Sequence, residues 1–439
     1  MFIVSKKILL VTLILLLIGA IVLSGLGIND PQVKWWSLVV FGLFWLMLIT
    51  VALLNEHLFE KHHHQKIGMI LIVLSLILIV MCALHIQYAA CGDCMHWSAV
   101  LGILIGIGVF AYATMMMRRE PQGVKQVDRE ETIFVSIASY RDKNCPRTVK
   151  SLFENAAVPE NVTVGICQQN DPDKDPDCYP EEWRDQIRII RMNYFDARGP
   201  TYARYLCSTL WSGEKYFLQI DAHILFAKDW DVKLINMIKA LKASGVKKPI
   251  LSHYTKLHSD YYSVHDNKST VPTICKSFFN DDKMISFEGA KNISVEPGQL
   301  PRPSAYIAGG MMFAESKFLK DVPFDPNLPY LFVGEEILHS IRFWTHGWDI
   351  FTPTENVVYH YYTRETEPKI WTDNKHYNTK DAMDKVKSIL KLDDETKIAP
   401  YLAQNLDIYG LGKERTLSDY FNFAGIDLKE KKVNKDFCA

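Results

Sequence analysis

An acid and a histidine stand two positions apart in this sequence, at the end of an apolar stretch. Residues 216–220 have the composition of a buried strand, and Asp221, Ala222 and His223 follow directly. A carboxylate and an imidazole are costly to bury there unless something compensates them. Both are ligands for a hard or borderline divalent cation such as Mn²⁺, with Mg²⁺ as the alternative. Two ligands do not close a site, so the pair predicts a metal ion whose other positions are filled by a diphosphate and water.

A second group of polar residues follows far downstream. Gly334 ends a loop, Glu335 and Glu336 open an amphipathic helix, and a short strand at 356–360 ends on His360. Because acids in the first turn of a helix are favoured by its dipole, we expect one of the two glutamates to be structural and the other functional. The sequence does not indicate which is which.

The elements that must position these residues alternate between strands and helices. Apolar strands are predicted at 132–139, 161–171, 186–193 and 215–220, and helices at 145–156, 200–211 and 229–241. Uniformly apolar strands alternating with helices indicate an α/β fold with a parallel sheet covered on both faces. Ligands bind such sheets beyond the carboxyl ends of the strands, where Asp221, His223 and the polar segments 139–142 and 168–171 are expected.

The N-terminal part of the chain has a different, strongly apolar composition. Four apolar runs, at about 8–28, 36–54, 67–84 and 97–117, are each close to the ~20 residues that cross a bilayer. They predict a four-helix transmembrane region over 1–117; buried helices of a soluble bundle are the alternative. The flanking basic residues place both termini, and the domain after the anchor, on the cytosolic side: Lys6, Lys7, Lys61, Lys66, Arg118 and Arg119.

Cysteines, histidines and sequons add secondary expectations. Six cysteines without paired spacing are expected to be reduced thiols of a cytosolic domain: Cys145, Cys167, Cys178, Cys207, Cys275 and Cys438. Cys91 and Cys94 form a local disulfide or two ordinary thiols, and the run of three histidines at 62–64 is a polar loop. Three N-x-S/T sequons, at Asn161, Asn267 and Asn292, should stay unmodified in the cytosol.

The length and the net charge of the chain exclude some classes of protein. The chain has 439 residues and a net charge of −1, so no basic excess points to nucleic acid and no acidic tail points to disorder. After the transmembrane region, we expect a charged linker at 118–131, a catalytic domain at 132–375 and a helical extension at 376–439.

Residues 133–364 resemble a known family. Six segments are similar to the GT-A glycosyltransferases of the polypeptide N-acetylglucosaminyltransferase type, which are cytoplasmic enzymes that modify hydroxyproline. In chain order, the segments are "IFVSIASYRD", "DARGPTYAR", "IDAH", "YIAGGMMFAES", "GEEI" and "VYHYYTR". They are more distantly similar to the mucin-type polypeptide GalNAc-transferases. The resemblance implies a GT-A, Rossmann-like domain, a UDP-GlcNAc donor, a Mn²⁺-type ion and transfer with retention at the anomeric carbon.

The resemblance also implies roles for individual residues. Asp221, His223 and His360 would bind the metal, and Glu335 or Glu336 would touch the sugar and the acceptor. His360 as a buried histidine satisfied within the core is the alternative. The donor would be bound by Tyr140, Arg141 and Gln168 near the nucleotide, Arg198 and Arg204 at the diphosphate, and Gly309 and Gly310 at the sugar.

The predicted function is membrane-anchored transfer of GlcNAc to a hydroxyl acceptor on a protein, hydroxyproline or Ser/Thr. The predicted anchor departs from the soluble enzymes of the family, so a lipid-linked or polysaccharide acceptor is one alternative. Against a processive synthase, the chain has no Q-x-x-R-W motif, and all predicted spans precede the domain. A catalytically dead, membrane-tethered scaffold is the other alternative.

Overall fold

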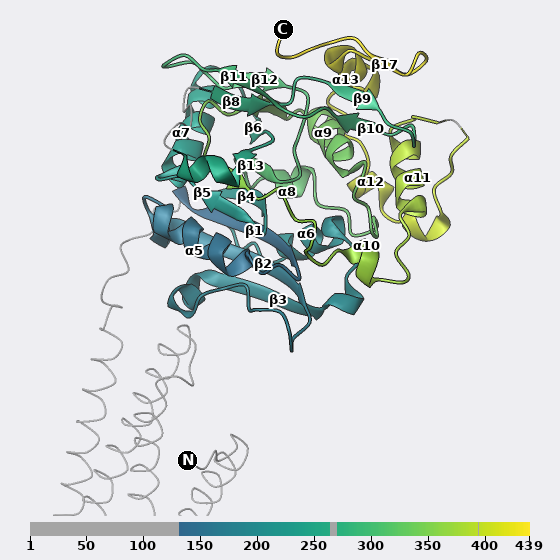
Figure 1. Ribbon diagram of the computed structural model, residues 1–439. Coiled ribbons are helices and arrows are strands. Elements are labelled where there is room, and N and C mark those ends of the chain that lie inside the picture. Colours follow the sequence, from purple (N-terminus) through teal and green to yellow (C-terminus); the bar gives the residue numbers. More distant parts are fainter. Residues whose placement is uncertain (1–130, 264–269, 394) are drawn as a thin grey trace, which may run out of the picture. The chain divides into compact units, whose positions relative to one another are not determined.

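A mixed sheet of eight strands organises the part of the chain that the computed structural model describes, residues 131–263, 270–393 and 395–439 (Figure 1). All of these residues belong to the unit Lys125–Ala439. The strand order is β12-β14-β6-β13-β4-β1-β2-β3. The strands are β1 (Ile133–Tyr140), β2 (Val162–Asn170), β3 (Ile187–Asn193), β4 (Tyr216–Asp221), β6 (Pro249–Ser252), β12 (Arg302–Ser304), β13 (Met311–Glu315) and β14 (Asp349–Thr352).

The predicted parallel arrangement is confirmed for the first four strands and wrong for part of the rest. β1 pairs in parallel with β2 and β4, and β2 with β3. β13, however, runs antiparallel between β4 and β6, and β12 runs antiparallel to β14. A helical crossover returns the chain in the same direction, whereas the connection between β6 and β13 consists largely of short strands and imposes no such direction.

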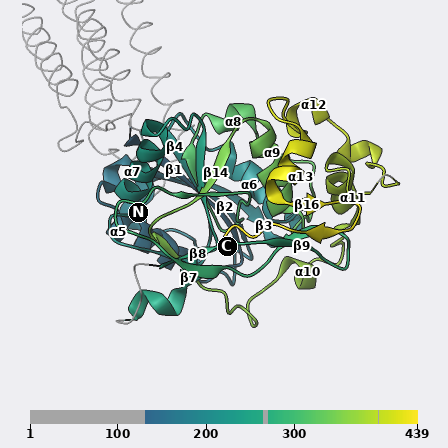
Figure 2. The ribbon, with the colours of Figure 1, turned by 90° about the horizontal axis from the view of Figure 1, so that it is seen from above.

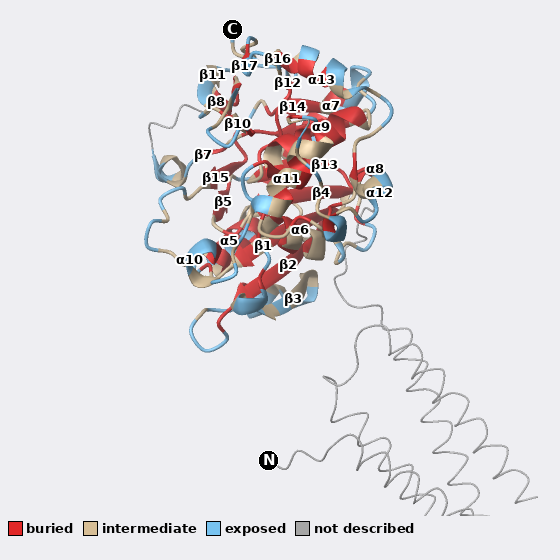
Figure 3. Cartoon of the chain, turned by 90° about the vertical axis from the view of Figure 1, so that its right-hand side faces the viewer, coloured by how far each residue is buried: buried red, intermediate tan, exposed pale blue. Residues whose placement is uncertain are grey.

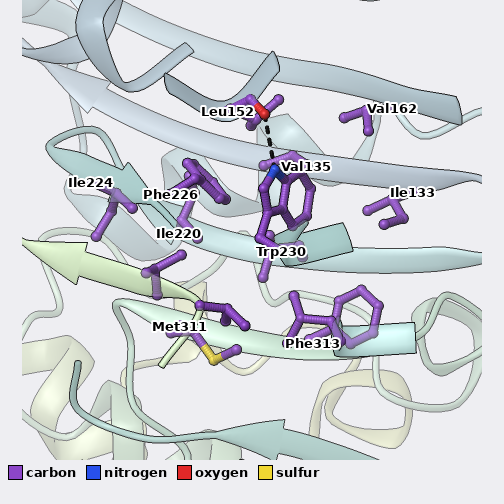
Figure 4. Close-up of a cluster of buried hydrophobic side chains, with 14 of the residues drawn as sticks. Ile133, Val135, Leu152, Val162, Ile220, Ile224, Phe226, Trp230, Met311 and Phe313 are labelled. Atoms are coloured by element: carbon purple, nitrogen blue, oxygen red, sulfur yellow. Dashed lines mark hydrogen bonds between the residues drawn. The ribbon is translucent and has the colours of Figure 1, made fainter. Parts of the chain in front are cut away.

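Helices cover both faces of the sheet because alternate residues of each strand point to opposite sides. On one face, α5 (Cys145–Asn155) and α7 (Trp230–Ala243) pack on β1 side chains such as Val135. Figure 4 shows this core, where the indole of Trp230 donates a hydrogen bond to the Leu152 carbonyl at 2.9 Å. On the other face, α6 (Pro200–Ser208), α8 (Phe318–Asp321) and α9 (Glu335–Thr345) cover Phe134 and its neighbours.

The segment predicted as a helical extension packs directly on the sheet's helical layer. It forms α11 (Lys380–Ile389), α12 (Leu406–Tyr409), α13 (Leu417–Ala424) and the hairpin β16 (Ile426–Asp427) and β17 (Lys432–Val433). Val386 of α11 and Tyr420 of α13 share a hydrophobic core with Leu338 of α9, and Figure 2 shows these helices grouped beside α9. α9 is therefore buried on nearly all sides, as its red colour in Figure 3 shows.

Smaller sheets complete the domain. β5 (Ile224–Phe226) and β7 (Lys256–Leu257) both pair with β15 (Val358–His360). β8 (Thr270–Thr273) pairs with β11 (Lys291–Ser294), and β9 (Ser277–Phe279) pairs with β10 (Ile285–Phe287). α10 (Ile370–Asp373) is a single turn of helix after β15. The predicted strand ending on His360 is thus confirmed, and its pairing with β5 brings it beside the residues that follow β4.

The expectation of six reduced thiols is wrong for four of the cysteines. Cys145 forms a disulfide with Cys178 and Cys275 with Cys438, with Cα atoms 4.9 and 5.1 Å apart. The partners are 33 and 163 residues apart in the chain. Such separations carry no recognisable spacing, so only the fold reveals the pairs.

The predicted membrane anchor lies in another part of the chain. Among the described helices, none is long and apolar enough to cross a bilayer. The four predicted spans, the CGDC segment and the histidine run at 62–64 all lie outside the described residues.

Candidate active site

A cavity of about 540 Å³ opens at the carboxyl ends of β1, β2 and β4. Tyr140, Gln169 and Asp221, from the ends of these three strands, all line it. The prediction that polar residues gather at this edge of the sheet is confirmed. Other lining residues come from the first turns of α6 and α9, the strand β15, and the segments 253–255, 309–310 and 368–371.

The three predicted metal ligands meet in this cavity. Asp221 ends β4, His223 follows two residues later, and His360 ends β15, where it is paired with Ile224 of β5. The ligand atoms of the three side chains lie within 4.8 Å of one another. The His360 Nε2 is 3.1 Å from the Asp221 Oδ2, and the two imidazole rings are 4.6 Å apart. Residues separated by 139 positions therefore form one cluster.

A buried carboxylate that the sequence did not single out holds His223. The Asp142 Oδ2 is 2.7 Å from the His223 Nδ1, and Arg364 donates to the same oxygen at 2.9 Å. A carboxylate on one ring nitrogen fixes the tautomer and leaves Nε2 free as a ligand. The segment 139–142 was recognised as polar and close to the site, but nothing in the sequence pairs Asp142 with His223.

The electrostatic surroundings keep Asp221 ionised. Burial alone would raise its pKa, but the hydrogen bond from His360 and the charges of His360, Arg204 and His223 outweigh burial and hold the pKa of Asp221 well below its usual range. Arg204 donates to the Asp221 Oδ1 at 3.2 Å. The carboxylate is therefore available to a cation across the physiological pH range.

Arg204 reaches this position because of how α6 begins. Pro200 occupies the first turn of the helix, and Gly199 before it has φ 92°. A Cβ on Gly199 would lie 2.8 Å from the Tyr330 Cα, so the position favours glycine sterically as well as conformationally. One turn into α6, Arg204 is buried between Asp221, Glu335 and the Gly309 carbonyl. Its pKa is raised because these carboxylate charges outweigh the effect of burial.

The two glutamates of α9 have different partners. Glu335 forms a buried ion pair with Arg204. Glu336 accepts hydrogen bonds from the Gly309 amide at 2.8 Å and from the Tyr254 hydroxyl at 2.8 Å. Both glutamates line the cavity, but only Glu335 is neutralised by a cation. Burial raises the pKa of Glu336 to about 7, so this carboxyl group changes charge near neutral pH.

The backbone of the two predicted glycines lies close to the side chains of Asp221 and Arg204. A Cβ on Gly310 would lie 3.0 Å from the Asp221 Oδ2, and one on Gly309 would lie 3.3 Å from an Arg204 nitrogen. Both glycines line the cavity, as expected. The Gly309 backbone, however, is engaged by protein side chains: its amide donates to Glu336 and its carbonyl accepts from Arg204 and Gln219.

Three residues that the resemblance placed at the donor do not line the cavity. Arg198 is exposed and lies over the Tyr202 ring. Arg141 is held by Asp175 and Asp373, and Gln168 by Asp177 and the Cys178 amide. Tyr140, which was also predicted to lie near the nucleotide, does line the cavity, and so does Gln169, the neighbour of Gln168 in β2.

Several lining residues were missed altogether. His253 and Tyr254 follow β6, and Trp371 lies in α10. His253 is buried, which lowers its pKa to about 4, and its Nδ1 lies 3.1 Å from the Pro272 carbonyl. Its isolated position gave no sequence signal. Helix α7 lies between His253 and Asp221 in the chain, and the pairing of the strands in the sheet brings the two residues to the same cavity.

The chain belongs to a glycosyltransferase family. The sequence pattern of the family described as Glycosyltransferase (GlcNAc) matches residues 132–183 and 179–430. The predicted enzyme class is thereby confirmed at the level of the family. The match continues through α11 and α13, which the predicted boundary at 375 had set apart.

Solved structures with a similar α/β arrangement are distant. GalNAc-T7, crystallised with UDP, GalNAc and Mn²⁺, is 15% identical over 66% of this chain and 54% of its own, with a TM-score of 0.44. Residues 1–349 of TarS from S. aureus, in complex with UDP-GlcNAc, are 12% identical over 68% of this chain and 77% of their own, with a TM-score of 0.37. This chain thus spans about half the length of GalNAc-T7. No curated protein matches it.

Proposed function

We propose that this protein is a metal-dependent, retaining glycosyltransferase that moves GlcNAc from UDP-GlcNAc to a hydroxyl group, with a protein hydroxyproline or Ser/Thr as acceptor. The observation that carries the proposal is the convergence of Asp221, His223 and His360 in a cavity of a chain from a GlcNAc glycosyltransferase family. The four predicted membrane spans make it an anchored enzyme in this proposal.

The donor set of the cavity fits a divalent cation. One carboxylate and two imidazoles offer an oxygen and two nitrogens to one ion, which suits Mn²⁺ and, less well, Mg²⁺. Asp142 orients the His223 ring so that its Nε2 can face the ion. When bound, the metal would act as a Lewis acid that stabilises the negative charge of the departing diphosphate.

The chain's own residues then share the remaining tasks. Arg204 anchors Asp221 in its ionised form and carries a fixed positive charge beside the cluster. Glu335 serves chiefly to compensate Arg204. Glu336 is the better candidate to touch the sugar or the acceptor, because no cation neutralises it and its pKa lies near 7. A carboxylate in this position can orient the attacking hydroxyl by accepting its hydrogen bond.

A panel of UDP-sugars tests the proposal directly. UDP release by the purified chain is measured with Mn²⁺, with chelator, and in the Asp221→Asn variant, with and without hydroxyproline peptides. Metal stabilisation of the leaving group is worth several kcal/mol, so we expect turnover of UDP-GlcNAc to fall about 10³-fold in the variant. The matched control Asp185→Asn, at an exposed position in the segment 181–186, should keep full turnover.

Two outcomes would overturn the proposal. One is turnover that persists in chelator and in Asp221→Asn. The other is a folded chain that binds UDP and Mn²⁺ but transfers no sugar to any hydroxyl acceptor, which would favour the scaffold instead.

A further inference from the structure

Four of the six cysteines of the described residues form disulfides, Cys145 with Cys178 and Cys275 with Cys438. The other two, Cys167 in β2 and Cys207 in α6, are free thiols of one small core cluster, where the Cys207 thiol donates to the Ile137 carbonyl at 3.2 Å. Both of these thiols are buried. The two disulfides are typical of a domain that folds under oxidising conditions.

Each disulfide closes a long loop, and three of the four bonded cysteines, Cys145, Cys178 and Cys275, are buried. Cys145 begins α5, and Cys178 ends the turn-rich loop that holds Asp175 and Asp177, the partners of Arg141 and Gln168. Cys275 precedes β9, and Cys438 lies next to the last residue of this sequence. The amide of Phe437 also donates to the Cys275 carbonyl at 2.8 Å. Closing loops of 33 and 163 residues restricts the unfolded chain strongly.

We propose that this domain folds in an oxidising, non-cytosolic compartment and that Asn292 carries an N-linked glycan there. The proposal opposes the cytosolic orientation predicted from the basic residues that flank the apolar runs. Disulfides persist in oxidising compartments and are rare in the cytosol, where thiols are kept reduced. The paired cysteines are an observation on the domain itself, whereas the flanking charges lie outside it.

Among the described sequons, Asn292 is the one that can carry a glycan. Asn292, Ile293 and Ser294 lie in β11, whose partner β8 is its only neighbour in a two-stranded sheet. Asn292 and Ser294 are exposed. Asn161 is only 8% exposed, at the point where the chain enters β2, so the folded domain has no room for a sugar there.

A glycan at Asn292 would leave the candidate active site open. β11 contributes no residue to the cavity. In Figure 1 it lies near the C-terminus, beside β8 and β12, whereas α10 at the cavity lies low on the opposite side. The modification is therefore compatible with the proposed function and does not depend on it.

The chemistry of both modifications balances with ordinary partners of such a compartment. In each disulfide, two thiols lose two protons and two electrons to a disulfide-bonded oxidoreductase through thiol–disulfide exchange. At Asn292, the amide nitrogen forms a bond to the anomeric carbon of a lipid-diphosphate-linked oligosaccharide. The bond from that carbon to the diphosphate breaks, the lipid diphosphate leaves, and the amide loses one proton.

The test is translation of the full chain in the presence of endoplasmic-reticulum microsomes. We expect a mass increase of one glycan that peptide N-glycosidase removes and that Ser294→Ala abolishes. Thr163→Ala and Ser269→Ala are the matched controls, which remove the sequons at Asn161 and at Asn267, a residue outside the described ones; both should keep the glycan. A chain unmodified at Asn292 overturns the proposal, whether or not the microsomes protect the domain from added protease.

A thiol count on the same material provides the second readout. After the microsomes are opened under non-reducing conditions, alkylation should label none of Cys145, Cys178, Cys275 and Cys438, and reduction should expose all four. Complete labelling without reductant would overturn the proposal. A Cys275→Ser and Cys438→Ser double variant should lose one pair from the count and keep the glycan, which separates the two modifications.

Discussion

Charged side chains are compensated differently on the two sides of the cavity. On the metal side, the Asp221 carboxylate is 29% exposed and faces two imidazoles. On the glutamate side, Glu335 and Arg204 are 5% and 6% exposed and neutralise each other inside the protein. Glu336, their neighbour, forms no ion pair in the described part of the chain and accepts hydrogen bonds from the Gly309 amide and the Tyr254 hydroxyl, while the nearby charge of Arg204 only partly offsets the rise of its pKa on burial.

The difference shows which charges the fold satisfies by itself and which it leaves for a ligand. A buried ion pair keeps its geometry without any other group, so Glu335 and Arg204 act as a fixed support. The partly exposed Asp221 carboxylate lies beside His223 and His360, so that all three can bind a cation. Asp142 holds the ring of His223 in place through its Nδ1. Four substitutions test this division, and they follow here from the largest expected effect to the smallest.

Glu335→Gln should cost the most stability. It leaves the buried Arg204 guanidinium with Asp221 as its one carboxylate partner, and breaking such a pair typically lowers the free energy of unfolding by about 3 to 5 kcal/mol. Urea unfolding followed by tryptophan fluorescence measures the loss. A loss below about 1 kcal/mol would mean that the glutamate side is not the fixed support described above.

Glu336→Gln should change how stability depends on pH. The pKa of Glu336 rises from 4.5 to about 7 on folding, so the folded state holds its proton more tightly than the unfolded state. The contribution of Glu336 to the free energy of unfolding should therefore be largest below pH 4.5, fall by at most about 3 kcal/mol as the pH rises to about 7, and stay constant above. The variant should lack this fall.

The control for that measurement is Glu182→Gln, on an exposed part of the segment 181–186. It should retain the wild-type dependence of unfolding free energy on pH. An identical fall in Glu336→Gln and in the wild type would show that another group is responsible.

Asp142→Asn should weaken the metal site while leaving the three ligands in place. The asparagine can still accept a hydrogen bond from the His223 Nδ1, but it loses the negative charge that braces the ring. Removal of such a partner usually lowers metal affinity about 10- to 100-fold. Titration calorimetry with Mn²⁺ measures this change. An affinity equal to that of the wild type would show that Asp142 does not support the metal site.

Arg198→Ala should have the smallest effect. Its guanidinium is exposed and lies over the Tyr202 ring, away from the cavity lining. We expect a change of less than about 0.5 kcal/mol in stability and less than about twofold in the KM for UDP-GlcNAc. A KM raised tenfold or more would instead support the diphosphate contact that the resemblance implied.

The site was predicted best where its signal was local. Asp221 and His223 adjoin one strand, and their residue types alone indicate a cation. Asp142 and His253 were missed as partners because their contacts cross 81 and 19 positions of the chain, to His223 and to Pro272. Arg198 and Arg204 show the same limit: both flank one motif, but only Arg204 faces inward once α6 is formed.

The sequence by itself determined the alternation of strands and helices, the sheet edge that carries the polar residues, and the ligand types at that edge. These features follow from apolar periodicity and from side-chain chemistry, which are properties of neighbouring residues. Only the tertiary structure decided the direction of β13, the pairing of the cysteines, and which glutamate is neutralised by Arg204. Each of these depends on contacts between segments far apart in the chain, which the folded sheet and its two helical layers create.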